Sequence, residues 1–127
     1  MNNQNAASAY REASFENAPP VKLVRMMYEG AIKHLERARR FDPVSDCAAF
    51  NEALGRADGI VSELRLSLET DVAPELCTQL EGLYLFIEER IALSFSERNA
   101  DSLEACTDVL RTLLDAWRQI DVVENAA

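Results

Sequence analysis

Apolar residues recur along most of this chain at spacings that alternate between three and four positions, the pattern of helices with one buried stripe. The first such stretch follows Pro19-Pro20, and proline in the first helical turn costs no backbone hydrogen bond. We predict a helix from Val21 to about Phe41, because the residue before Pro43 is pushed out of helical geometry. The buried stripe of this helix would comprise Val24, Tyr28, Ala31, Leu35 and Ala38.

The same spacing predicts three further helices. They run from Ser45 or Asp46 to Leu68, from Pro74 to Phe95 and from Leu103 to Ile120. Either Ser45 or Asp46 could cap the first of these, Pro74 suits the start of the second, and residues 124–127 would fray from the third. Their buried stripes would comprise Phe50, Leu54, Ala57, Val61, Leu64 and Leu68, then Leu76, Leu80, Leu83, Ile87, Ile91 and Phe95, then Leu103, Cys106, Leu110, Leu113, Trp117 and Ile120.

Four helices of about 20 residues, each roughly 30 Å long and joined by short turns, predict an all-α, antiparallel up-and-down four-helix bundle. We place this bundle domain at residues 18–127. Residues 1–17 are small and polar, so we expect a flexible N-terminal arm with one short helix, anchored by Tyr10 and Phe15. Gly55 and Gly59 lie four positions apart within one predicted helix. Because helical glycine costs about 1 kcal/mol relative to alanine, the pair suggests that a neighbouring backbone comes close there.

The third predicted helix has more apolar surface than one core stripe needs. Residues 82–87, GLYLFI, contain no charge, and at about 100° per residue such a run encircles the helix. We therefore expect Leu85 and Phe86 to face outward. In the last helix, Leu110, Leu113 and Trp117 would form the core stripe, while Val109, Leu114 and Ala116 would broaden it toward another face.

Surplus apolar surface of this kind usually marks an interaction site. Met26 and Met27 add to it on the first helix, and methionine adapts its shape to varied apolar partners. Two other interpretations stay open. The wide stripes could be core in a tightly wrapped bundle or lie under the N-terminal arm, or they could form a surface for self-association.

Charge narrows the choice of partner. The net charge of the 127-residue chain is -9, which would repel phosphate backbones and anionic lipid headgroups, so we expect neither nucleic acid nor membrane as a partner. No apolar run approaches the roughly 18 residues of a membrane span, and no signal peptide is evident, so we expect a cytoplasmic protein. The basic stretch of residues 22–40 could serve charge matching between helices or partner steering.

The residue types of most active sites and metal sites are missing. His34 is the only histidine, and the three cysteines, Cys47, Cys77 and Cys106, are too widely spaced for a zinc site and fit reduced thiols. We expect no cofactor and no enzymatic activity. An enzyme built only of Arg and Glu side chains stays a minor alternative.

Two motifs resemble a known family. The stretch PPVKLVRMMYEGAIKHLERARR, Pro19 to Arg40, resembles the first bundle helix of the flagellar export chaperones of flagellin, the FliS family. The stretch LRTLLDAWRQI, Leu110 to Ile120, is similar to the last helix of that family. Tyr10 also matches a tyrosine in the family's N-terminal arm, although Ala7 stands where the family has an aliphatic residue and Pro19 replaces the usual serine cap.

The resemblance implies a cytoplasmic chaperone that binds the disordered C-terminal segment of flagellin, prevents premature polymerisation and delivers the subunit for export. It also links Tyr10 to docking on the flagellar export gate. The predicted partner-binding residues are Tyr10, Met26, Met27, Leu85, Phe86, Val109 and Leu114. The alternative function is a self-associating helical-bundle adaptor for another regulatory protein.

Overall fold

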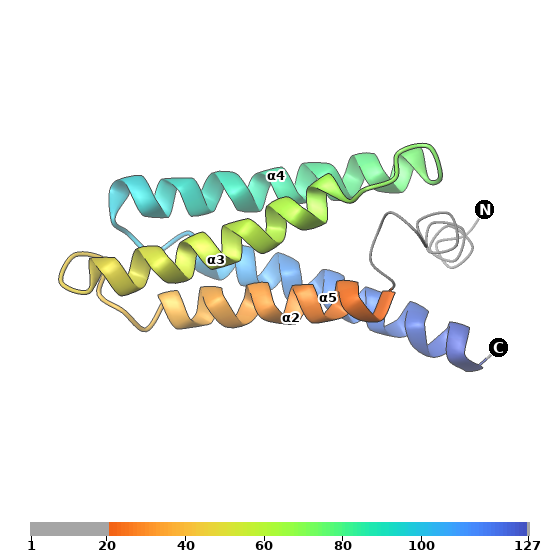
Figure 1. The fold of residues 1–127 in the computed structure, drawn as a ribbon, viewed down its shortest axis with the longest axis horizontal. Helices are drawn as coiled ribbons and strands as arrows, with labels where there is room; N and C mark the ends of the chain where they lie inside the picture. Colours follow the sequence, from red (N-terminus) through yellow and green to blue (C-terminus); the bar gives the residue numbers. More distant parts are fainter. Residues whose placement is uncertain (1–20, 127) are drawn as a thin grey trace.

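The computed structural model describes residues 21–126, with side chains described as far as residue 119. Four helices make up this part of the chain: α2 (Val21–Ala38), α3 (Cys47–Leu66), α4 (Pro74–Glu97) and α5 (Leu103–Ala126). Successive helices run in opposite directions (Figure 1), and the described residues contain no strand. The predicted all-α four-helix bundle is therefore confirmed. The predicted arm, residues 1–17, lies outside the described residues.

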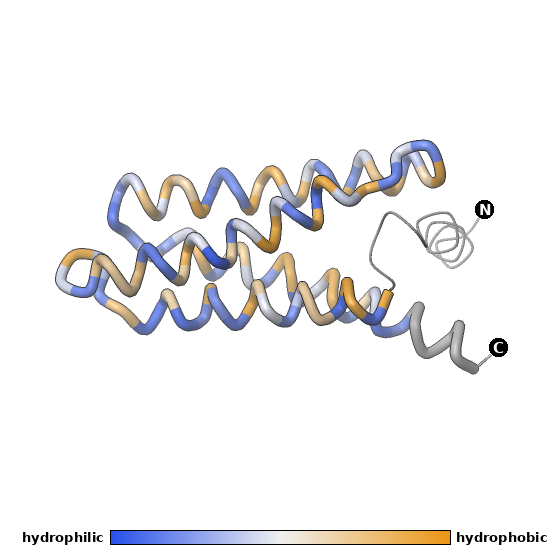
Figure 2. The backbone as a smooth tube through the Cα atoms, in the orientation of Figure 1, coloured by the Kyte–Doolittle hydropathy of each residue, from blue (hydrophilic) through white to orange (hydrophobic). Residues whose placement is uncertain are grey.

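The helices occupy the corners of a bundle whose centre is the apolar core. α2 packs against α3 and α5, and α4 packs against the same two helices, so α2 and α4 stand at diagonal corners. The stripe predicted for α2 is buried in full. Hydrophobic and hydrophilic residues alternate along every helix (Figure 2), and the buried hydrophobic residues come from all four. The largest fully buried side chains are Tyr28, Tyr84, Phe50, Leu35, Leu54 and Ile87.

The first turn differs from its prediction. α2 ends at Ala38, three residues before Phe41, and the chain continues through single turns closed by bonds such as Phe41 N to Ala38 O, at 3.1 Å. Asp42 is the residue that organises the connection, because its carboxylate accepts the backbone N–H groups of Val44 and Ser45 at 2.9 and 2.8 Å. Asp46 occupies the N-cap position of α3 but makes no capping bond.

The other helix ends also show how local chemistry sets the boundaries. α3 stops at Leu66, two residues before the predicted Leu68, and Pro74 is the first residue of α4 as expected. α4 ends where Arg98 adopts a left-handed conformation with φ of 52°. α5 continues past Ile120 to Ala126, and so includes residues 124–126, which were predicted to fray, because no glycine or proline interrupts the sequence there.

The expectation for the paired glycines is wrong. Gly55 and Gly59 both lie on the exposed side of α3, and a Cβ atom added at either would meet nothing within 4 Å. No neighbouring backbone approaches them. A closer contact occurs on α2, where a Cβ at Gly30 would lie 3.4 Å from Cδ1 of Ile60.

The cysteines are unpaired and the basic residues of α2 form ion pairs with other helices, in line with the sequence analysis. Cys47, Cys77 and Cys106 are unpaired thiols, and burial raises the pKa of Cys106 to about 11. The basic stretch around α2 pairs with other helices, for example Arg37 with Glu52 of α3 at 3.3 Å. None of the described helices is long and apolar enough to cross a membrane.

Candidate partner-binding surface

The uncharged run of α4 does encircle its helix. Tyr84 and Ile87 point into the core and are buried, whereas Leu85 points away from it and is 46% exposed. Phe86, one position further round, is partly buried at the edge of the core. The prediction that Leu85 and Phe86 face outward is confirmed for Leu85 and holds in part for Phe86.

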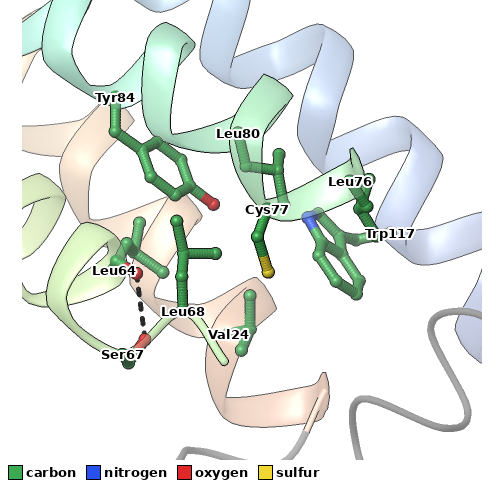
Figure 3. A pocket seen from close by; sticks show the side chains of 9 residues that line it. All are labelled: Val24, Leu64, Ser67, Leu68, Leu76, Cys77, Leu80, Tyr84 and Trp117. Carbon is green, nitrogen blue, oxygen red and sulfur yellow. Dashed lines mark hydrogen bonds between the residues drawn. The ribbon is translucent and has the colours of Figure 1, made fainter. Parts of the chain in front are cut away.

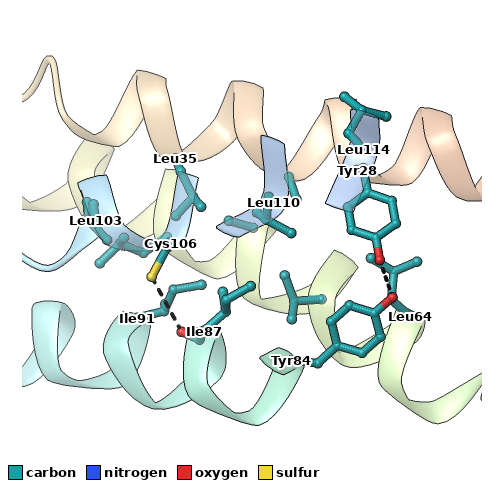
Figure 4. Close-up of a cluster of buried hydrophobic side chains, with 14 of the residues drawn as sticks. Tyr28, Leu35, Leu64, Tyr84, Ile87, Ile91, Leu103, Cys106, Leu110 and Leu114 are labelled. Atoms are coloured by element: carbon teal, nitrogen blue, oxygen red, sulfur yellow. Dashed lines mark hydrogen bonds between the residues drawn. The ribbon is translucent and has the colours of Figure 1, made fainter. Parts of the chain in front are cut away.

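Contacts between α4 and α5 show which part of α5 lies beside Phe86. The Cys106 thiol donates to the carbonyl of Ile87 across 4.0 Å (Figure 4). Val109 and Leu113 follow one and two turns later on α5. Because the helices are antiparallel, Val109 is level with the turn of α4 just before Ile87, next to Phe86, and Leu113 is level with the turn before that. We call Phe86, Val109 and Leu113 the α4–α5 face; Leu85 lies about 100° further round α4, on its outer side.

The α4–α5 face is the most open seam of the bundle. The packing between α4 and α5 is less extensive than the packing between any other two neighbouring helices. The Arg90 guanidinium carbon lies 5.1 Å from the centroid of the Phe86 ring, a cation–π contact that holds the ring at the surface of the seam. Phe86, Val109 and Leu113 are each only partly buried, so part of their apolar surface is exposed at this seam.

The placement of Leu114 outside the core is wrong. Leu114 is 5% exposed and belongs to the core, and Leu113 takes the partly buried position on the flank. Both residues stand one turn beyond Leu110, at spacings of three and four, so the stripe alone could not decide between them. The positions of the neighbouring helices determine which leucine is buried, since Leu114 turns toward α2 while Leu113 and Val109 turn toward α4.

The remaining candidates do not join the α4–α5 face. Met26 is 55% exposed and Met27 is partly buried against the core, both on α2. Because α2 and α4 are diagonal, these methionines lie away from Leu85 and Phe86. Tyr10 lies outside the described residues.

A buried polar contact that the sequence did not reveal joins three helices at the bundle centre. The Tyr28 hydroxyl of α2 is hydrogen-bonded to the Tyr84 hydroxyl of α4 (Figure 4). The Trp117 indole N–H of α5 donates to Tyr28 Oη at 3.2 Å. The two tyrosine rings are tilted, with centroids 6.2 Å apart. The available signal was Tyr28 and Trp117 on their predicted stripes, since a buried hydroxyl or indole needs a partner; Tyr84 was on no predicted stripe.

A small apolar pocket lies beside this contact, near the turn between α3 and α4 (Figure 3). Tyr84 and Trp117 form part of its wall, with Val24 on the α2 side. The other lining residues are Leu64, Ser67, Leu68, Leu76, Cys77 and Leu80. Its volume of about 20 Å³ holds a water molecule but not a side chain, so the pocket as it stands is a packing defect rather than a ligand site.

Several charged side chains of the described residues form ion pairs between helices, such as Arg65 with Glu88 and Arg111 with Glu36. Burial would raise the pKa of Glu88, but hydrogen bonds from Arg65, at 2.6 Å, and from Ser62 outweigh it, and the pKa is lowered. Burial, followed by the charges of Arg37 and Arg56, lowers the pKa of His34. Within the described range, no group of three His, Cys, Asp or Glu side chains could hold a metal ion.

Comparison with known proteins decides the family. The profile described as "Flagellar protein FliS" matches residues 2–124. The chain belongs to the FliS family. A "Flagellar secretion chaperone FliS" of Salmonella typhimurium is 32% identical over 117 residues, covering 88% of this chain and 87% of the relative. Proteins of the same name from Campylobacter jejuni and Bacillus subtilis are 29% and 27% identical, covering 100% and 91% of this chain and 99% and 86% of their own lengths.

Family membership agrees with the resemblance carried by the first and last predicted helices. The described part of the first motif folds as α2, where Tyr28 is fully buried, and the second motif lies in α5, where Trp117 reaches Tyr28. The motif residues of this FliS-family chain thus meet at the bundle centre. Their observed role is to hold α2, α4 and α5 together.

Proposed function

We propose that this chain is a cytoplasmic flagellar secretion chaperone that binds the disordered C-terminal segment of flagellin. Binding would prevent premature polymerisation and present the subunit for export, and the chain would act as a binding protein, not an enzyme. The observation that carries the proposal is the accessible apolar α4–α5 face in a member of the FliS family. The relatives named as flagellar secretion chaperones support the same role.

The α4–α5 face suits an amphipathic helix formed by the client. Such a helix presents apolar side chains at positions i, i+3, i+4 and i+7, which would contact Phe86, Val109 and Leu113, with Leu85 at the outer edge. Ordering a disordered segment consumes several kcal/mol of the gross interaction, so the complex stays releasable. The Tyr28 contact keeps the scaffold under this face rigid, which reduces the ordering cost on the chaperone side.

Calorimetry with a flagellin C-terminal peptide tests the proposal. We expect 1:1 binding with a negative heat-capacity change, because apolar surface is buried. Leu85→Ser and Phe86→Ala should each weaken binding by about fivefold or more, as expected for apolar anchors in an interface.

Phe95→Ala is the matched control. Phe95 is 55% exposed and lies on the same helix, but nine residues are two and a half turns, so it stands on the opposite side of α4 from Phe86. This variant should bind like the wild type. Equal losses in all three variants, or no heat at high micromolar concentration, would contradict the proposal. A tight dimer without affinity for flagellin would instead favour the self-associating adaptor.

A further inference from the structure

A second and roomier pocket lies between α2 and α5, on the other flank of α5 from Val109 and Leu113. Its volume is about 360 Å³, within the range of small-ligand sites, and it is open to solvent along one side. It is lined by Glu29, Ile32 and Lys33 of α2 and by Arg111, Leu114, Asp115 and Arg118 of α5. None of these side chains belongs to the α4–α5 face.

The floor of this pocket is apolar and firmly held. Leu114 is a core residue, and the small part of its side chain that is not buried lines the pocket. Ile32 packs against the same core from α2. Two aliphatic side chains from facing helices therefore form a fixed base. A ligand can gain affinity there by covering them with an aliphatic group of its own.

The rim of the pocket is cationic in a chain whose net charge is -9. Lys33, Arg111 and Arg118 surround the floor, against the carboxylates of Glu29 and Asp115. Arg118 lies 3.6 Å from Glu29 and 3.8 Å from Asp115, longer than the 2.7–2.9 Å of a charge-assisted hydrogen bond, so its donors are weakly engaged.

The other two cations also have donors to offer. Arg111 is paired through Nη2 with Glu36, at 2.8 Å, which leaves further N–H groups of its guanidinium. Within the described part of the chain, Lys33 has no ion-pair partner. An anionic group above Ile32 and Leu114 would meet these cations from both helices.

We propose that this pocket binds the C-terminal residue of a peptide whose last side chain is aliphatic. The pocket spans Glu29 to Lys33 on α2, about 6 Å, and Arg111 to Arg118 on α5, about 10 Å, at 1.5 Å per residue. That reach fits one or two residues and is too short for a docked helix. A terminal leucine or valine supplies an aliphatic group and a carboxylate within this reach.

Each wall of the pocket then has a defined partner in the ligand. The carboxylate lies between Lys33 and Arg118, the aliphatic side chain covers the floor, and Glu29 and Asp115 accept the last backbone N–H groups of the peptide. The open side lets the preceding residues leave toward solvent. This inference does not depend on the proposed flagellin role, since it rests on a separate flank of α5.

Titration of the labelled full-length protein with two probes, followed by NMR, tests the inference. The probes are the tripeptide N-acetyl-Ala-Ala-Leu with a free carboxylate and the same peptide with an amidated end. We expect the free acid to shift the methyl signals of Ile32 and Leu114, and we expect amidation to weaken binding about tenfold, because a charge-assisted contact is lost. Equal binding of both peptides, or binding of neither, would overturn the inference.

Variants and a free amino acid complete the test. Lys33→Gln and Arg118→Gln should each weaken the binding of the free-acid peptide about tenfold. Circular dichroism checks that both variants are folded. Arg56→Gln, an exposed arginine of α3 outside the pocket, should leave the affinity unchanged. If leucine itself binds as tightly as the tripeptide, the pocket is an amino-acid site and the peptide terminus is the wrong ligand.

Discussion

The hydroxyl of Tyr28 joins three helices because it pairs with the Tyr84 hydroxyl and also accepts the Trp117 indole N–H. All three side chains are buried, so each polar atom would lose its hydration without a partner. A buried contact of this kind fixes the relative positions of α2, α4 and α5 more sharply than apolar packing does. The same three helices contribute to the core beneath the α4–α5 face.

Tyr28→Phe should lower the free energy of unfolding by about 1–3 kcal/mol, because the Trp117 N–H loses its acceptor inside the core. Tyr84→Phe is the matched control, since it leaves Tyr28 Oη in place for Trp117 and should cost less. Urea unfolding followed by circular dichroism gives both values. A smaller loss for Tyr28→Phe than for Tyr84→Phe would show that the indole contact contributes little.

Sequence patterns also reach a limit at the scale of single residues. The stripe of the last helix was predictable, but Leu113 and Leu114 fit the spacing equally well, and only the position of α2 assigns Leu114 to the core. The tyrosine contact could not be predicted, because its members lie 56 and 89 residues apart along the chain. Contacts of this range depend on how helices pair, which local periodicity does not encode.

At the scale of helices, α3 and α4 are joined by a partly buried ion pair. Arg65 of α3 donates to Glu88 of α4 at 2.6 Å, and Ser62 adds a second bond to the same carboxylate. Glu88 lies one turn from Tyr84 along α4, so the pair fixes the rotation of the helix. That rotation turns Phe86 toward α5.

The lowered pKa of Glu88 gives a pH dependence with a definite sign. A carboxylate whose folded pKa lies below its unfolded value stabilises the protein above the unfolded pKa, and this stabilisation is lost as the pH falls through the folded pKa. Glu88→Gln should therefore be less stable than the wild type at pH 7, and the difference should shrink below about pH 4.

Nearby Asp58 acts in the opposite direction, because burial and then the charge of Glu88 raise its pKa. Asp58 should therefore reduce the stability difference between the wild type and Glu88→Gln without reversing its sign. Urea unfolding between pH 3 and 7 measures the effect, with the exposed Glu52→Gln as a control that should change little. A difference between wild type and Glu88→Gln that grows as the pH falls would contradict the assignment.

Helix existence followed from the sequence more reliably than helix ends. Pro74 is the first residue of its helix in the prediction and in the structure, since proline is suited to the first turn. The end of α2 was missed because Pro43 marks only the residue before it, whereas the helix already ends at Ala38 and the chain reaches Asp42 through single turns. The glycines of α3 were misread for a similar reason, since a missing side chain looks the same in sequence whether it faces a neighbour or solvent.

At the scale of the whole molecule, the two flanks of α5 have different characters. The flank toward α4 offers apolar, partly buried side chains. The flank toward α2 offers an aliphatic floor surrounded by three cations and two carboxylates. Surplus hydrophobicity in the sequence predicted the first surface in outline. It could not predict the second, because the pocket forms only where residues 29–33 and 111–118 come together.

The central claim is that the flagellin C-terminal segment binds at the α4–α5 face. The most direct measurement is a set of intermolecular NOEs between the methyl-labelled protein and an unlabelled flagellin C-terminal peptide. We expect NOEs from Leu85, Val109 and Leu113 to the aliphatic protons of the peptide, and none from the exposed Leu66 of α3. NOEs confined to Met26 and Leu66, with no contact at Leu85, Val109 or Leu113, would contradict it.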